Sequence, residues 1–270
     1  MKVSTMKAPT MKASTMNTSL MRTSVLGLAL AAALGGWHGI ASAAGAVDPA
    51  ALVARLDTLR RPAASNLRMD FTLTTSDGGT QDTYRYTGLI RKDAGTLVLA
   101  QDGDQRGQKY LYTPGGYWLY APRTRRPMRL TPLQTLRGQA SIGDISRLNL
   151  ADDYNAAFAP QDAATVDGRE CWVLALTAKS PEATYAAITL YVAKADQVPV
   201  QAELMAGTGR KLKTLKFGGL KKVGGQNLLT TFTYIDAVNP DRRTVQQINA
   251  VESAGTAAAM FQSQALALDN

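Results

Sequence analysis

The 270-residue sequence contains one histidine and one cysteine, and this scarcity excludes several kinds of chemistry. The histidine, His38, lies in an N-terminal segment that we expect to be removed, which leaves the mature chain with none. Ser-His-Asp and Cys-His nucleophilic sites and the usual zinc sites are then excluded. Cys171 stands alone in the apolar run ECWVLALTA, which excludes an intrachain disulfide and indicates a buried thiol. We therefore expect no bound metal and no cofactor.

Acidic residues also provide little sign of a catalytic pair. Asp152 and Asp153 are the only adjacent acids in the sequence. Neighbours on a strand point to opposite faces, so a turn or a helix cap is the favoured interpretation of this pair. Carboxylate pairs and Ser-Lys dyads are the catalytic designs that the composition still permits. The glycine pairs are typical of turns rather than of phosphate-binding loops, and they stand at 78–79, 115–116, 218–219 and 224–225. The sequence favours a protein that is not an enzyme.

The N-terminus has the pattern of a secretory signal peptide. Residues 1–24 carry four basic residues and no acid, an apolar run covers 25–33, and Ala-Ser-Ala at 41–43 supplies a cleavage site. The apolar run is short and is followed by glycines, so it would be a poor membrane anchor. We predict cleavage after Ala43, export, and a single domain over 44–270. Three methionines remain candidate starts of the chain: Met1, Met16 and Met21.

The net charge of +9 overstates the basicity of the mature chain, because four of the basic residues lie in this leader. A mildly basic exported protein is a poor candidate for nucleic-acid binding. Two basic stretches remain. One stretch is the arginine cluster that follows the aromatic strand YWLY, namely Arg123, Arg125, Arg126 and Arg129. In the other, KLKTLKFGGLKK over 211–222, alternation places Lys211 and Lys213 together on one strand face. We interpret this as a solvated basic face, with a strip that contacts a membrane or a partner as the alternative.

Hydrophobic periodicity predicts one helix followed by strands. DPAALVARLDTLRRP, over 48–62, indicates an amphipathic helix with Asp48 as its N-cap, and Arg60 faces away from the apolar stripe. From Asn66 onward the period changes to two, and roughly ten or more short strands follow with tight turns between them. One or two short helices are predicted in the insertion at 131–150. This order predicts a mainly β (α+β) fold built on a strongly curved antiparallel sheet or barrel.

Ten large apolar residues are candidates for the inner face of that sheet. They are Met69, Phe71, Leu73, Tyr86, Leu97, Leu99, Trp118, Tyr120, Met128 and Leu130. Few polar groups accompany them, and an acyl chain needs exclusion of water more than hydrogen bonds, so a lipid-binding cavity is one interpretation. The alternative is an ordinary packed core, which is the commoner role of any single buried apolar residue.

Three stretches occur in the same order in a known family. They are the aromatic strand with its basic hairpin, a Ser/Gly loop that leads to Asp-Tyr, and a turn that feeds an aliphatic strand: YWLYAPRTRRPMRLTP, LRGQASIGDISRLNLADDY and DGRECWVLALTAK. With them, residues 67–251 resemble the LolA/LolB-like superfamily of periplasmic outer-membrane lipoprotein-sorting proteins, and in particular its longer LolA-like branch.

The resemblance implies an unclosed β-barrel in which an N-terminal helix and a helical lid cover a hydrophobic cavity. It implies a periplasmic carrier, which we expect to be monomeric, for the acyl chains of lipoproteins or for free lipid. An inner-membrane transporter would be the donor and an outer-membrane protein the acceptor, with no cofactor. Members of the longer branch also serve RND/MMPL-type transporters, so the alternative is a non-catalytic accessory subunit of an RND/MMPL-type or ABC transporter.

The arginine cluster then has two interpretations. It forms a cationic rim of the cavity that meets a lipid phosphate, an anionic membrane or an acidic partner. Alternatively, it is a solvated hairpin whose charges discourage aggregation at the sheet edge.

Overall fold

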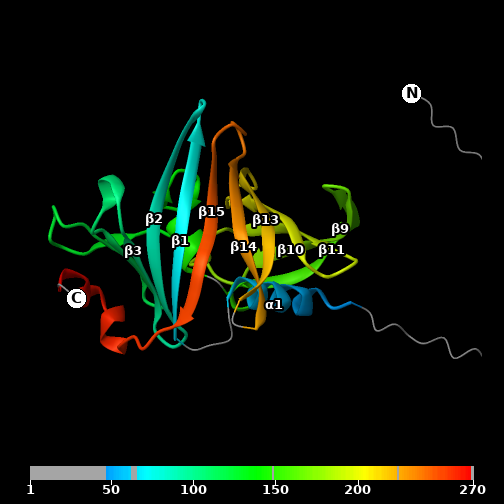
Figure 1. Ribbon diagram of the computed structural model, residues 1–270. Coiled ribbons are helices and arrows are strands. Elements are labelled where there is room, and N and C mark those ends of the chain that lie inside the picture. Colours follow the sequence, from blue (N-terminus) through cyan, green and yellow to red (C-terminus); the bar gives the residue numbers. More distant parts are fainter. Residues whose placement is uncertain (1–46, 62–65, 148, 224, 269–270) are drawn as a thin grey trace, which may run out of the picture. The chain divides into compact units, whose positions relative to one another are not determined.

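The computed structural model describes residues 47–61, 66–147, 149–223 and 225–268 (Figure 1). The predicted signal peptide and its cleavage site after Ala43 lie outside the described residues. Within the described ranges, no helix is long and apolar enough to cross a membrane.

Thirteen of the described strands form one antiparallel sheet. The strands β1 to β6 and β9 to β15 are each consecutive in the sheet, and the two halves join where β1 (Asn66–Asp77) pairs with β15 (Arg243–Ser253), side by side in Figure 1. The sheet ends at β6 (Met128–Leu130) and β9 (Tyr154–Val166) and is not closed. The predicted mainly β, unclosed fold is confirmed.

The remaining strands of this sheet alternate in direction and lie between these ends. They are β2 (Thr80–Arg91), β3 (Gly95–Ala100), β4 (Lys109–Thr113), β5 (Gly116–Tyr120), β10 (Arg169–Ala178), β11 (Ala187–Ala193), β12 (Pro199–Met205), β13 (Lys211–Val223) and β14 (Gln226–Asp236).

The N-terminal helix forms as the sequence predicts. It is α1 (Pro49–Arg60), and Asp48 caps it by accepting a hydrogen bond from the Ala50 N–H at 3.0 Å. Its apolar stripe is buried, and the helix contacts both β14 and β9, which four other strands separate in the sheet. A helix touches both only if the sheet curves around it, so α1 lies on the inner, concave face. Arg60 is buried as well, which corrects the expectation that it faces away from the apolar stripe.

The insertion at 131–150 covers the same inner face. It contains a two-stranded hairpin, β7 (Thr135–Arg137) and β8 (Ala140–Ser141), followed by α2 (Ile142–Ser146), which contacts β3 and β4. The short α3 (Leu150–Asp153) then packs against α1. One or two short helices were predicted here: α2 lies within the insertion and α3 begins at its last residue, whereas the hairpin was not predicted.

The second half of β2, together with β3 to β5, carries apolar side chains on both faces, and both faces are covered. Side chains such as Val98 and Tyr117 join the inner core around α1. Their neighbours in sequence, such as Leu97, join an outer cluster with Phe261 and Leu266. These last two residues come from the C-terminal 3₁₀ segments, which pack on β3, β4 and β5. The 3₁₀ helices are η1 (Gly103–Gln105), η2 (Ala258–Phe261) and η3 (Ser263–Ala267).

Candidate functional site

The structure divides the ten predicted lining residues between the two faces of the sheet. Five of them belong to the inner core or pack against it: Met69, Phe71, Leu73, Tyr86 and Leu130. Four belong to the outer cluster or pack against it: Leu97, Leu99, Trp118 and Tyr120. Met128 is 42% exposed. The sequence placed the outer four on the inner face because strands that are apolar on both sides show no contrast between their faces.

The arginine cluster is exposed and lies in β6 and in the connection that precedes it. Arg129 donates a hydrogen bond to the Gly115 carbonyl at 2.9 Å, and its guanidinium lies 5.5 Å from the ring of Trp118 on the outer face. The other three members, Arg123, Arg125 and Arg126, have no ion-pair partner among the described residues. These three arginines thus form a cationic surface without ion pairs in the described part of the chain, and the role of the arginine cluster as a cavity rim stays a prediction.

Two small cavities lie on the inner face, on either side of Arg60 and Asp144. The larger has a volume of about 30 Å³ and an apolar lining that includes Leu190, Ala202 and Phe217. The smaller has a volume of about 20 Å³, and its apolar lining is Met69, Phe71, Ile90, Val98, Ile145, Phe232 and Ile248. Arg60 and Asp144 border both cavities and therefore form a polar wall between them. Each cavity has room for only one or two water molecules, so neither can hold an acyl chain in this conformation.

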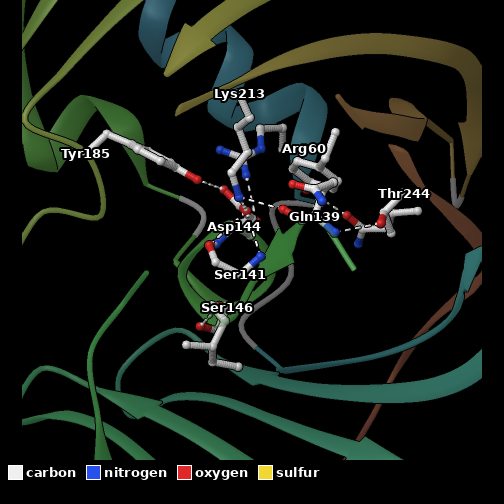
Figure 2. Close-up of polar contacts among 11 residues, drawn as sticks. Arg60, Gln139, Ser141, Asp144, Ser146, Tyr185, Lys213 and Thr244 are labelled. Carbon is white, nitrogen blue, oxygen red and sulfur yellow. Dashed lines mark hydrogen bonds and ion pairs between the residues drawn. The ribbon is translucent and has the colours of Figure 1, made fainter. Parts of the chain in front are cut away.

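Asp144, in α2, is a buried carboxylate with a full set of donors. Its Oδ2 accepts hydrogen bonds from the Ser141 N–H and hydroxyl, both at 2.8 Å, and from Lys213 Nζ at 2.9 Å. Its Oδ1 accepts from the Tyr185 hydroxyl at 2.6 Å. Figure 2 shows Lys213 and Tyr185 converging on this carboxylate from different elements. Burial alone would raise the pKa of Asp144, but Lys213 and the hydrogen bonds outweigh burial and lower the pKa below its ordinary 3.8. Asp144 is therefore ionised at neutral pH.

Lys213, in β13, ties the insertion to the sheet. Its Nζ also donates to the Gln139 carbonyl at 2.6 Å, and the Gln139 N–H donates to Thr244 Oγ1 in β15 at 2.8 Å. The expectation that Lys213 shares a solvated face with Lys211 is wrong, because Lys213 is buried and Lys211 is exposed. A register shift between Leu204 and Met205, opposite these lysines, breaks the simple alternation. Two strands that lie far from the insertion in the sequence, β13 and β15, thus hold the insertion over the inner face.

Sequence reasoning missed this polar centre, although one local signal was visible. Ser141 and Asp144 form a capping box, in which each side chain bonds the backbone N–H of the other residue. A serine followed three residues later by an acid is a recognised helix-start pattern. That pattern identifies the cap but carries no information about Lys213, which is 69 residues away.

A polar cleft lies next to the larger cavity. It has a volume of about 240 Å³ and is lined by basic and acidic side chains that include Arg61 and Lys92. Arg147 and Asp153 border both the cleft and the larger cavity, and their side chains form an ion pair at 2.5 Å. Arg147 also donates to the Glu182 carbonyl at 2.6 Å. This ion pair therefore lies between the polar cleft and the larger cavity.

Solved structures share this architecture. A LolA superfamily protein from Nitrosomonas europaea is 25% identical with a TM-score of 0.72, and the match covers 80% of this chain and 98% of that one. A DUF1329 family protein from Desulfovibrio piger is 22% identical with a TM-score of 0.68, covering 82% and 100%. An outer-membrane lipoprotein-sorting domain from Vibrio parahaemolyticus is 16% identical with a TM-score of 0.66, covering 80% and 97%. The protein thus has the LolA-like fold, and the predicted resemblance is confirmed.

Its family follows from a separate comparison. The model of a family described as "Uncharacterized protein" matches residues 92–267, which is more than half of the chain. The chain belongs to that family. A comparison with curated proteins gave no match.

Proposed function

We propose that this protein is a periplasmic carrier that binds the acyl chains of lipoproteins or lipids inside its curved sheet and shuttles them toward the outer membrane. The observation that carries the proposal is an inner face with two apolar cavities, covered by α1 and α2 rather than by a second sheet. A covering made of short elements can move without breaking the strand pairing of the sheet. The shared fold with lipoprotein-sorting proteins supports the same role.

Loading requires the covering elements to move. The two cavities together are far smaller than a fatty-acyl chain, so the described conformation has no room for one. Moving α2 away from the sheet would separate Asp144 from Lys213, and moving α1 away from α2 would separate Arg60 from the Asp144 carbonyl and join the two cavities. The buried polar contacts would then favour the conformation in which α1 and α2 lie on the sheet. An entering acyl chain would pack against the inner face of the sheet in place of the apolar side chains of these helices.

The proposal also includes export of the protein to the periplasm and binding of lipid without covalent chemistry. The leader at 1–43 supports delivery to the periplasm, where the protein would receive lipid from an inner-membrane transporter and pass it to an outer-membrane acceptor. Binding and release use movement and apolar burial, so the proposal includes no catalytic step and no cofactor. We expect the carrier to act as a monomer.

Native mass spectrometry of protein purified from the periplasm without detergent tests the proposal. We expect bound acyl species, and we expect Ala202→Phe to reduce their occupancy because the new ring fills the larger cavity. Ala193→Phe is the matched control: Ala193 is equally buried, but it lies in a separate cluster with Cys171 and Val200. An unliganded mass for the wild type, together with refusal of added phospholipid and lipopeptide, would contradict the proposal.

A second candidate function rests on the arginine cluster. Three arginines without ion-pair partners in the described part of the chain form a surface suited to an acidic partner, as an accessory subunit of an envelope transporter would need. Replacing Arg123, Arg125 and Arg126 by serine should abolish copurification with a transporter if this candidate is correct. The same variant should retain bound lipid if the carrier proposal is correct.

A further inference from the structure

Arg60 is a buried cation whose hydrogen-bonding capacity is incompletely used. Its side chain extends from the last turn of α1 into the interior and is 6% exposed. Its Nε has no hydrogen-bond partner among the residues that the structure describes. Its terminal NH2 donates to the Asp144 main-chain carbonyl at 3.3 Å, which is a long contact. Figure 2 shows this side chain beside Lys213 and Asp144.

The carboxylates near Arg60 are occupied by other donors. The Asp144 carboxylate is bound by Ser141, Lys213 and Tyr185, and only its main-chain carbonyl faces Arg60. Asp57, three residues before Arg60 in α1, accepts from the backbone N–H groups of Leu150 and Ala151 at 2.9 and 2.8 Å. Arg60 consequently forms no ion pair within the described residues.

Packing alone does not explain an arginine at this position. A buried charge without a paired carboxylate is costly, and a leucine or methionine would fill the same space beside Phe232, whose ring lies 6.0 Å from the guanidinium. A basic residue near the C-terminus of α1 would interact favourably with the helix dipole, but such a residue need not be buried. Arg61 follows Arg60 immediately and lines the polar cleft. A buried donor with unused hydrogen-bonding capacity, bordering two apolar cavities, has instead the chemistry of an anion-binding group.

We propose that Arg60 binds the anionic group of an amphiphilic cargo whose acyl chain occupies the adjoining apolar cavities. A guanidinium presents Nε and a terminal nitrogen as a planar fork, which fits the two oxygens of a carboxylate or of a phosphate. The apolar lining on either side, exemplified by Leu190 and Phe71, receives the chain. This inference rests on the proposed function and narrows its cargo to lipids with a negative charge next to the acyl chain.

Paired lipid probes that differ only in charge test the inference. Purified, delipidated protein is titrated with oleate and with oleyl alcohol, and separately with dioleoyl phosphatidate and with dioleoylglycerol. For the wild type we expect the anionic member of at least one pair to bind about 10- to 150-fold more tightly, the range of a charge-assisted hydrogen bond. Preference in the first pair identifies a carboxylate, and preference in the second a phosphate.

Three variants test whether the preference for anionic probes depends on Arg60. Arg60→Met should lose the charge preference and still bind the neutral probes, because methionine keeps the apolar length of the side chain. Arg60→Lys should keep part of the preference, and it provides a variant with a buried cation if the methionine protein does not fold. Arg61→Met, next in the chain but lining the polar cleft, should keep the full preference.

The outcomes separate the two proposals. A wild type that binds neutral and anionic probes equally, or an Arg60→Met protein that keeps the preference, overturns the role of Arg60 and leaves the carrier proposal intact. A wild type that binds none of the four probes overturns the carrier proposal and this inference with it.

Discussion

Replacing Lys213 by methionine tests whether the buried ion pair holds the insertion on the sheet. The Lys213 and Asp144 side chains are 10% and 3% exposed, and their charged atoms lie 2.9 Å apart. Removing one partner of a buried pair leaves an uncompensated charge and costs about 3–5 kcal/mol of unfolding free energy. In a domain of this size, that loss lowers the Tm by roughly 6–20 °C. Urea unfolding, followed by tryptophan fluorescence and repeated by circular dichroism, measures the loss directly.

Lys211→Met is the matched control for this prediction. Lys211 lies on the same strand and pairs with Glu203 at 3.0 Å, but its side chain is 41% exposed. An exposed pair contributes only about 0–1 kcal/mol, so the control should lose little. Adding Asp144→Leu to Lys213→Met should restore part of the lost stability, because an apolar replacement of both charges is often neutral. Equal losses in the two single variants would refute the view that the buried pair fastens the insertion.

Three further predictions concern acid stability, a tight turn and the outer face. Because the folded pKa of Asp144 is lowered, its carboxylate contributes stability above the unfolded value of 3.8 and loses it as pH falls through the folded pKa. The gap in urea midpoint between wild type and Asp144→Asn should therefore shrink below pH 3.8. Gly138 has a φ of +54°, and an added Cβ would lie 2.3 Å from Thr244 Oγ1. Gly138→Ala should thus cost at least about 1 kcal/mol more than Gly168→Ala, where left-handed strain is the same but the space is open; equal losses would argue against the contact. Trp118→Asp should speed hydrogen exchange in the C-terminal segments that cover the outer cluster and leave lipid binding unchanged; loss of binding would place Trp118 at the cargo after all.

Local patterns were sufficient to predict much of the fold. Asp48, Pro49 and the leucine stripe defined α1 to within two residues at its C-terminal end. Alternation of apolar and polar residues identified the strands, and their tight turns indicated an antiparallel order. The unclosed architecture came from the family resemblance rather than from these patterns.

The faces of β2 to β5 could not be predicted in the same way. Leu97 and Val98 are both buried, one under the C-terminal segments and the other under α1 and α2. The segment that covers Leu97 lies more than 150 residues further along the chain, so no local pattern reveals it. Alternation identifies two faces but not which of them is the inside.

The polar centre was hidden for a related reason. Lys213 lies in a basic stretch and Arg60 on the side of the predicted helix away from its apolar stripe, so both were expected to face solvent. Both are buried against Asp144, which is 69 or more residues away in the sequence, so no local pattern reveals their burial. The candidate site therefore emerged from tertiary structure.

Photocrosslinking tests the central claim most directly. A diazirine-bearing fatty acid is bound to the intact protein and photolysed, and the modified residues are identified by peptide mass spectrometry. The carrier account predicts adducts on residues that line the inner cavities, such as Leu190, Phe217 and Phe232. Adducts confined to the outer cluster around Leu97 and Trp118, or none at all, would contradict a lipid-binding interior.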